Sequence, residues 1–262
     1  MIFTTNISDW MHHLDRRNPI STHIWTSTLL LLKILDKNFT TGTFFIERKV
    51  AKKYPILIRK IARAGHEVAC YVLPQQNGKR FAYETAHTMQ LLEDITGLKV
   101  IGIRSSNLTT ENTSFKAYCT LLQKMGIKYD SSLLPQATLK TLAIYNPSLL
   151  AFDVFSIDEY PLPLTPHFGG DTFRRQPYFM THYIGKSLPQ NNTVFHMQAY
   201  ELGLQEYNNL KDIIIIPADK KSNFWGRKSI PIKLHKLLKD FSFSSFYQHY
   251  YAENKLEYTA QR

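Results

Sequence analysis

The stretch that decides the fold is residues 42–72, G-T-F-F-I-E-R-K-V-A-K-K-Y-P-I-L-I-R-K-I-A-R-A-G-H-E-V-A-C-Y-V. It opens with a short apolar run, 42–46, of the kind that forms a buried strand. Apolar side chains then recur with the i, i+3, i+4, i+7 spacing of one helix face, at Tyr54, Leu57, Ile58 and Ile61. Gly65 can end that helix, and 66–72 again has strand-like residues. The stretch therefore predicts a strand–helix–strand unit, which is typical of parallel sheets.

Strand and helix patterns alternate on both sides of this unit. Strand-like runs occur at 2–5, 99–103, 127–130 and 193–198. Helical patterns occur at 26–37, 81–96, 115–122 and 231–240. Prolines are frequent in 135–175, which we expect to be rich in loops. Repeated βα units predict an α/β fold built on a parallel sheet or barrel. Since no linker is recognisable, we expect a single domain over residues 1–250, followed by a C-terminal tail at 251–262.

The chain is basic and has few cysteines. Its 32 Lys and Arg residues exceed its 21 Asp and Glu residues by 11, which favours an anionic glycan or a phosphate-rich membrane face as partner. Two cysteines suit a reducing compartment, and the N-terminus has no basic stretch followed by an apolar core. We therefore expect a cytoplasmic protein that can be peripheral at the inner membrane. Only the charge favours nucleic acid, so we expect no nucleic-acid partner.

Nine segments in a fixed order carry a resemblance to a known family. They include T-F-F-I at 43–46, M-G-I-K-Y-D-S-S-L-L-P at 125–135 and F-H-M-Q-A-Y-E-L at 195–202. Together they resemble the polysaccharide deacetylase (NodB-homology) family, in particular its branch associated with bacterial exopolysaccharide and capsule synthesis, over about residues 2–247. The resemblance implies a distorted (β/α) barrel of the polysaccharide deacetylase type, with its site at the C-terminal ends of the strands.

The resemblance also implies a chemistry, and this chain departs from it. Similar proteins remove acetyl groups from N-acetylated sugars with a divalent metal such as zinc, which an Asp and two His hold. A second Asp acts as the general base, and a His late in the sequence acts as the general acid. All five positions carry other polar residues here: Asn6 for the base, Ser8 for an acidic residue, Tyr71 and Gln75 for the imidazoles, and Gln198 for the acid. None is a usual ligand of such a metal, so we expect no metal cofactor.

Three chemically capable residues remain close to these positions. Asp9 is the carboxylate left in the first motif, and on a regular strand it would face away from Asn6 and Ser8. Arg104 matches a family arginine that orients the catalytic carboxylate, but Asn6 stands where that carboxylate would be. Arg104 can therefore bind an anionic sugar, or it can be a buried arginine that is paired elsewhere. His196 shares a strand face with Gln198, either as a substitute for proton transfer or as part of the core.

These residues leave three functions open. The first is a catalytically inactive protein that binds a glycan or lipid-linked saccharide, or assists cell-surface polysaccharide synthesis. Its pocket would use Asn6, Ser8, Asp9, Tyr71, Gln75, Arg104, His196 and Gln198. The second is a hydrolase of non-standard mechanism that uses Asp9 and His196. The third is a scaffold in a polysaccharide-synthesis complex, its pocket closed by Tyr71.

Basic residues in the C-terminal third form a further candidate surface. They could contact anionic lipid or a phosphate-linked glycan, or they could be a solvated basic face. The residues are Arg174, Arg175, Lys211, Lys220, Lys221, Arg227, Lys228, Lys233, Lys236 and Lys239. The aromatic-rich segment that follows, 241–251, is expected to pack into the core.

Overall fold

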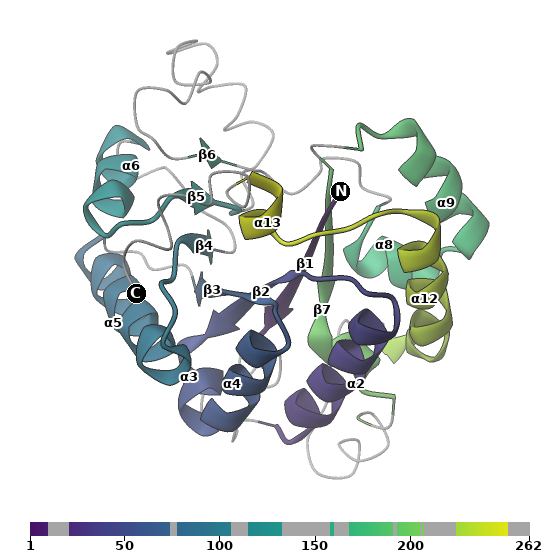
Figure 1. Ribbon diagram of the computed structural model, residues 1–262, viewed down its shortest axis with the longest axis horizontal. Coiled ribbons are helices and arrows are strands. Elements are labelled where there is room, and N and C mark those ends of the chain that lie inside the picture. Colours follow the sequence, from purple (N-terminus) through teal and green to yellow (C-terminus); the bar gives the residue numbers. More distant parts are fainter. Residues whose placement is uncertain are drawn as a thin grey trace. The chain divides into compact units, whose positions relative to one another are not determined.

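The computed structural model describes residues 1–9, 21–73, 78–105, 115–132, 158–159, 168–190, 193–204, 206 and 224–250 (Figure 1). The chain forms two compact units. Unit 1 comprises residues 1–44, 60–67 and 165–262, and unit 2 comprises residues 45–59 and 68–164. The predicted C-terminal tail, 251–262, lies outside the described residues.

The described strands form one seven-stranded sheet in the order β6-β5-β4-β3-β2-β1-β7. Their bounds are β1 Ile2–Ile7, β2 Thr43–Glu47, β3 Glu67–Val72, β4 Gly102–Ser105, β5 Tyr129–Asp130, β6 Asp158–Glu159 and β7 Val194–Gln198. The pairs β1–β7, β3–β4, β4–β5 and β5–β6 are parallel. This is the parallel α/β architecture that the alternation of strand and helix patterns predicts.

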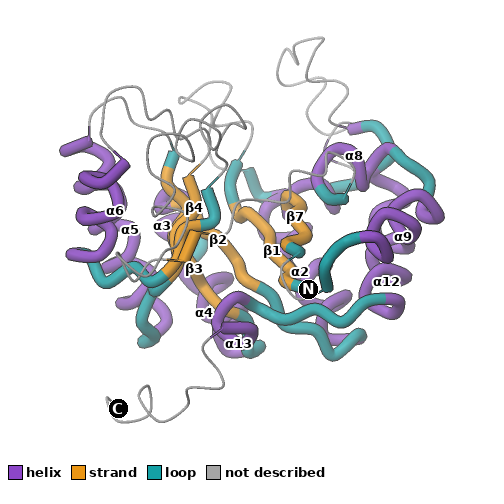
Figure 2. The backbone as a smooth tube through the Cα atoms, turned by 90° about the horizontal axis from the view of Figure 1, so that it is seen from above, coloured by secondary structure: helices purple, strands orange, loops and turns teal. Residues whose placement is uncertain are grey.

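Helices connect these strands. Those wholly in unit 2 are α3 Arg48–Lys53, α5 Gly78–Thr96 and α6 Phe115–Lys124. Those wholly in unit 1 are α2 His23–Lys37, α8 Gly170–Arg175, α9 Tyr178–Ser187, α12 Ile230–Asp240 and α13 Phe246–Tyr250, with 3-10 turns η4 Ala199–Leu202 and η6 Arg227–Ser229. Helix α4, Pro55–Arg63, begins with a proline, a residue that the first turn of a helix tolerates, and covers the predicted apolar positions Leu57, Ile58 and Ile61. Within unit 1, α8, α9 and α12 gather on one side of β1 and β7 (Figure 2).

The structure differs from the sequence prediction at 170–175, the end of the stretch expected to be rich in loops, because these residues form α8. Helix α9 follows at 178–187, where the sequence analysis predicts no element. Gly169 and Gly170, both with positive φ, turn the chain into α8, and a Cβ on Gly169 would lie 2.8 Å from the His196 carbonyl oxygen. The loop expectation failed at these residues because Gly169 and Gly170 mark the start of a helix rather than an irregular segment.

An aromatic core holds unit 1 together around β1 and β7. Phe3 stacks on Phe195 with ring centres 5.6 Å apart, and Phe173 meets Phe195 edge-on at 5.0 Å. Phe241 and Phe246 are also buried, which confirms that the segment after α12 packs into the core. Its backbone reaches β1, where the Phe3 N–H donates to the Ser244 carbonyl oxygen at 3.0 Å.

His66 is a structural residue of unit 1. The Gly42 N–H donates to His66 Nδ1 at 3.3 Å, and the imidazole lies 4.9 Å from the centre of the Phe44 ring. Burial lowers the pKa of His66 to about 4, although Asp36 opposes the shift. The imidazole is therefore neutral in the folded protein over most of the physiological range.

This buried histidine makes stability depend on pH. The pKa is lowered on folding, so the stabilising effect is complete above the unfolded pKa near 6.5 and is lost as pH falls towards 4. At about 1.4 kcal/mol per pKa unit, we expect the free energy of unfolding to fall by up to about 3 kcal/mol over that range. Urea unfolding at a series of pH values measures this, and His66→Gln should flatten the curve. The exposed His87→Gln should leave it unchanged, and equal curves for all three proteins would contradict the prediction.

Candidate functional site

The C-terminal ends of β1 and β7 bring three of the predicted site residues together. The two strands pair in a parallel register that aligns Thr4 with His196 and Asn6 with Gln198. Because side chains alternate along a strand, these residues lie on one face of the sheet. Asn6, His196 and Gln198 are therefore neighbours at the end of the strands where parallel α/β folds place their sites.

The other two residues of the first motif continue from β1 and are buried with it. Ser8 and Asp9 follow the last residue of the strand. The Ser21 N–H donates to Asp9 Oδ2 at 2.6 Å, and the Ser21 hydroxyl accepts the His23 N–H at 3.1 Å. Since His23 begins α2, the Asp9 carboxylate links the end of β1 to the start of that helix. Asp9 thus has a structural partner that the sequence did not indicate.

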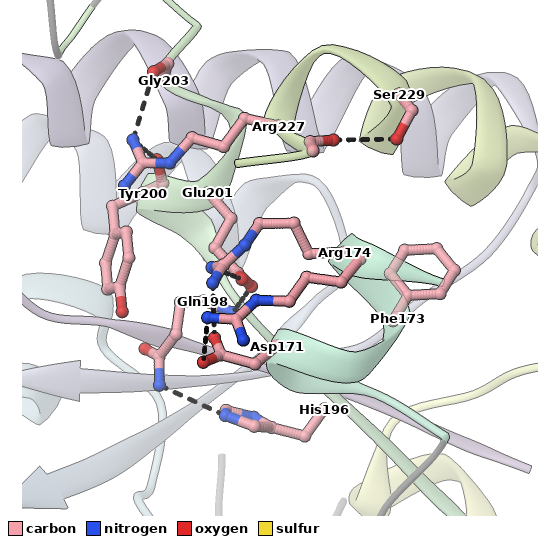
Figure 3. A network of polar contacts seen from close by, with 12 residues as sticks. Asp171, Phe173, Arg174, His196, Gln198, Tyr200, Glu201, Gly203, Arg227 and Ser229 are labelled. Carbon is pink, nitrogen blue, oxygen red and sulfur yellow. Dashed lines mark hydrogen bonds and ion pairs between the residues drawn. The ribbon is translucent and has the colours of Figure 1, made fainter. Parts of the chain in front are cut away.

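Gln198 and His196 form the polar centre of this site (Figure 3). The Gln198 Nε2 amide donates to His196 Nε2 at 3.2 Å, as the shared strand face predicts. Gln198 also occupies the capping-box position before η4. In that capping box its side-chain oxygen faces the Glu201 N–H, although the buried Oε1 makes no hydrogen bond of normal geometry to any described residue. A carbonyl oxygen accepts two hydrogen bonds, so a ligand hydroxyl or amide can add one at this atom.

A buried ion pair between Arg174 and Glu201 supports the backbone of Gln198 (Figure 3). The Gln198 N–H donates to Glu201 Oε2 at 2.9 Å, and Arg174 Nη1 lies 2.6 Å from Glu201 Oε1. Burial raises the pKa of Glu201, and the Gln198 N–H and the Arg174 charge oppose that shift. Arg174 also contacts the exposed Asp171 at 2.9 Å. The ion pair holds the start of η4, and with it the end of β7, against α8.

Lys233 of α12 adds a second support to α8. Its Nζ donates to the carbonyl oxygens of Phe173 at 2.6 Å, Arg174 at 2.7 Å and Gln176 at 3.2 Å. These are carbonyls at the C-terminal end of α8, where a cation is favourable. Burial lowers the pKa of Lys233, and the nearby negative charge of Glu201 opposes that shift.

The predicted basic face is wrong for three of its members. Arg174, Arg227 and Lys233 are buried. Arg227 Nη1 contacts Glu206 Oε2 at 2.5 Å, so that arginine, like Arg174, is paired inside unit 1. Sequence charge alone cannot separate such buried pairs from surface residues. Of the other members, Arg175, Lys228, Lys236 and Lys239 are exposed, and Lys211, Lys220 and Lys221 lie outside the described residues.

Tyr71 and Arg104 lie together in unit 2, aligned on β3 and β4. Both are buried. Arg104 donates from Nε to the Ser131 carbonyl at 3.0 Å and from Nη2 to the Ser131 hydroxyl at 2.8 Å, and its guanidinium lies 4.0 Å from the centre of the Phe45 ring. Burial lowers the pKa of Arg104 to about 9, against the opposing effect of Tyr129, Tyr71 and Asp130. These contacts agree with the alternative of a buried arginine that is paired elsewhere.

The residues at the family's metal positions do not suit a divalent metal ion. A hydroxyl at Ser8 and a phenol at Tyr71 stand where the resemblance implies a carboxylate and an imidazole. Gln75 falls outside the described residues. Across the described ranges, no group of three or more His, Cys, Asp or Glu side chains is placed to hold a metal ion.

Sequence reasoning missed the residues that support the site. Arg174 was assigned to the surface, and Glu201 was given no role. A signal was available, because Glu201 lies in the segment 195–202, and Arg174 lies in F-G-G-D-T-F-R-R-Q-P-Y at 168–178, another of the segments that carry the resemblance. A basic and an acidic residue in two matching segments could have been considered as a pair.

Comparison with known proteins supports the fold assignment. The sequence matches no protein-family profile and no curated protein. Its structure resembles that of a protein assigned as a polysaccharide deacetylase from Mycobacterium smegmatis, with 16% identity and a TM-score of 0.60 over 99% of this chain and 90% of that one. It also resembles a CE4-family pseudoenzyme from Bacillus anthracis, with 11% identity and a TM-score of 0.48 over 94% of this chain and 63% of that one. A third similar structure is the peptidoglycan deacetylase PdaC from Bacillus subtilis, with 13% identity and a TM-score of 0.47 over 99% of this chain and 93% of that one.

The first of these similarities establishes the class of fold. At 16% identity and a TM-score of 0.60, nearly the whole chain follows the (β/α) barrel type of the polysaccharide deacetylases. The prediction of an α/β fold of that type is confirmed. Fold alone does not assign a reaction, since function resides in the site that a fold carries.

Proposed function

We propose that the protein binds a glycan built from N-acetylated sugars and does not deacetylate it. The observation that carries this proposal is the Gln198 amide, whose buried Oε1 makes only the capping-box contact with the Glu201 N–H and no hydrogen bond of normal geometry among the described residues. It lies at the end of β7, aligned with Asn6 on β1. Two neutral amides there offer both donors and acceptors, which suits sugar hydroxyl and acetamido groups. Neither amide can act as an acid or base near neutral pH.

The alternative of a hydrolase that uses Asp9 and His196 has weaker support. The Asp9 carboxylate accepts the Ser21 N–H at 2.6 Å, so it serves the packing of α2. His196 Nε2 accepts the Gln198 amide at 3.2 Å, so its lone pair is engaged. Both groups would have to leave these partners before they could move a proton. We likewise propose that no divalent metal is resident, because Ser8, Tyr71 and Gln75 stand at the ligand positions that the resemblance implies.

The setting of this activity is also part of the proposal. The family resemblance favours cell-surface polysaccharide synthesis, and a lipid-linked saccharide at the cytoplasmic side of the inner membrane would present the glycan to the chain. The charge of +11 suits an anionic membrane face. None of the helices in the described part of the chain has the length and apolar character that a bilayer span requires. A scaffold role in a synthesis complex is the second candidate, since Tyr71 is a buried side chain on β3.

The test is titration calorimetry with a β-1,4-linked tetramer of N-acetylglucosamine. We expect saturable binding, and we expect Gln198→Ala to weaken it about tenfold, as loss of one well-made hydrogen bond predicts. Gln90→Ala is the matched control, because Gln90 is an exposed glutamine on α5 in unit 2. The same samples should release no more acetate than the tetramer releases in buffer without the protein.

Two outcomes would overturn the proposal. Acetate release that needs a divalent ion, together with about one such ion per chain by elemental mass spectrometry, would show a working deacetylase. Equal affinity for Gln198→Ala and the unchanged protein would show that the glycan binds elsewhere.

A further inference from the structure

Helix α9 exposes an apolar stripe. The side chains of Phe179, Met180 and Tyr183 are 71%, 43% and 78% exposed, whereas Thr181 and Gly185 on the opposite side of the helix are buried. Phe179 and Tyr183 are four residues apart and so lie on one helix face. Large apolar side chains that gather on one exposed face mark an interaction surface, unlike single scattered ones.

Helix α12 extends this stripe. It lies beside α9 in both views of unit 1 (Figures 1 and 2), and Tyr178 and Asp240 join the two helices through a hydrogen bond of 2.5 Å. Lys236 Nζ lies 5.8 Å from the centre of the Tyr178 ring. Ile232, one helical turn before Lys236, is 65% exposed. The side of unit 1 formed by these neighbouring helices thus carries the exposed Ile232 and Lys236 on α12 and brings Lys236 to the first residue of α9.

The charge of this side is positive. Lys186 follows Tyr183 by three residues on the exposed face of α9, and Lys236 is exposed on α12. The two helices contain one acidic residue, Asp240, and its carboxylate is engaged by Tyr178 and by His182 Nδ1 at 2.9 Å. Exposed aromatic side chains beside lysines are the composition of helices that lie in a membrane interface.

We propose that this face docks the protein onto an anionic lipid bilayer, with α9 in the plane of the interface. The docking face consists of Phe179, Met180, Tyr183, Lys186, Ile232 and Lys236. Its apolar side chains would enter the headgroup region, and its lysines would contact anionic headgroups. An anionic membrane is favoured over a neutral partner because the face and the whole chain, at +11, carry the complementary charge. The proposal is independent of glycan binding, since vesicles without saccharide test it.

The first test is co-sedimentation of the full chain with phosphatidylcholine vesicles that contain 30% phosphatidylglycerol. We expect Phe179→Ser combined with Tyr183→Ser to reduce vesicle binding at least tenfold, since the two exposed rings supply the apolar contact. The matched control is Ile56→Ser combined with Tyr83→Ser, which removes two apolar side chains that are 57% and 55% exposed in unit 2. It should bind like the unchanged protein.

The second test separates local from overall charge. Lys186→Gln combined with Lys236→Gln should weaken binding about fivefold per lysine at 0.15 M salt. The control pair, Lys52→Gln with Lys53→Gln, removes the same charge from exposed positions on α3. If it has the same effect, only net charge matters and the docking face is wrong.

Three further results would overturn the proposal. They are the absence of vesicle binding, equal binding to pure phosphatidylcholine vesicles, and a dimer in solution that the Phe179→Ser and Tyr183→Ser pair dissociates. The last would assign the face to a second copy of the chain. Because these measurements contain no saccharide, they can fail while the glycan titration succeeds.

Discussion

Arg174→Ala is expected to lower the free energy of unfolding by about 3–5 kcal/mol, the usual cost of leaving one member of a buried ion pair alone. Arg174 and Glu201 have side chains that are 1% and 2% exposed, and their Nη1 and Oε1 atoms are 2.6 Å apart. Without the arginine, Glu201 keeps the Gln198 N–H but faces the interior with an uncompensated charge. Urea unfolding followed by circular dichroism measures the loss.

Two comparisons test the stated cause. Asp171→Asn removes the exposed partner of Arg174 and should cost less than about 1 kcal/mol, because such surface pairs contribute little. The loss in Arg174→Ala should also shrink as pH falls, since the buried Glu201 then takes up a proton. A loss that stays constant with pH would show that the arginine acts through packing and not through its charge.

Phe195→Ala is the second large effect, with an expected loss of about 3–5 kcal/mol. Phe195 is completely buried on β7. Its ring centre lies 5.6 Å from that of Phe3, 5.6 Å from Phe168 and 5.0 Å from Phe173, so its removal opens a cavity between β1, β7 and α8. Urea unfolding monitored by fluorescence measures the change.

The matched control is Phe179→Ala, which removes the same ring from an exposed position on α9. It should change stability by less than about 0.5 kcal/mol. A loss below about 1 kcal/mol in Phe195→Ala would contradict the packing of β7 against the aromatic core.

Much of the fold was predictable because its periodic segments are strong. The strand–helix–strand stretch 42–72 contains β2, α4 and β3 within two residues of their predicted positions. Helix α9 was missed because its apolar side chains are exposed, so its pattern is not that of a helix with one buried face. Helix α3, with six residues, is too short for periodicity to show.

The site was predictable in part for a similar reason. Strand alternation correctly placed His196 beside Gln198, because that rule is local. It could not show that Asp9 bonds to Ser21, twelve residues away, or that Arg174 bonds to Glu201, 27 residues away. Such contacts depend on how distant segments meet, which a single sequence does not encode in any local pattern. Buried charges are consequently where sequence reasoning failed most.

The pairing of β1 with β7 has a consequence for how the chain is made. The Thr4 hydroxyl of β1 donates to the Phe195 carbonyl oxygen across a separation of 191 residues. At about 5–20 residues per second, a ribosome needs roughly 10–40 s after β1 emerges to deliver that partner. During this interval Phe3 and the unpaired edge of β1 are open to other chains. Unit 1 therefore completes its folding late in translation, and nascent chains that stall before β7 are the ones we expect chaperones to hold.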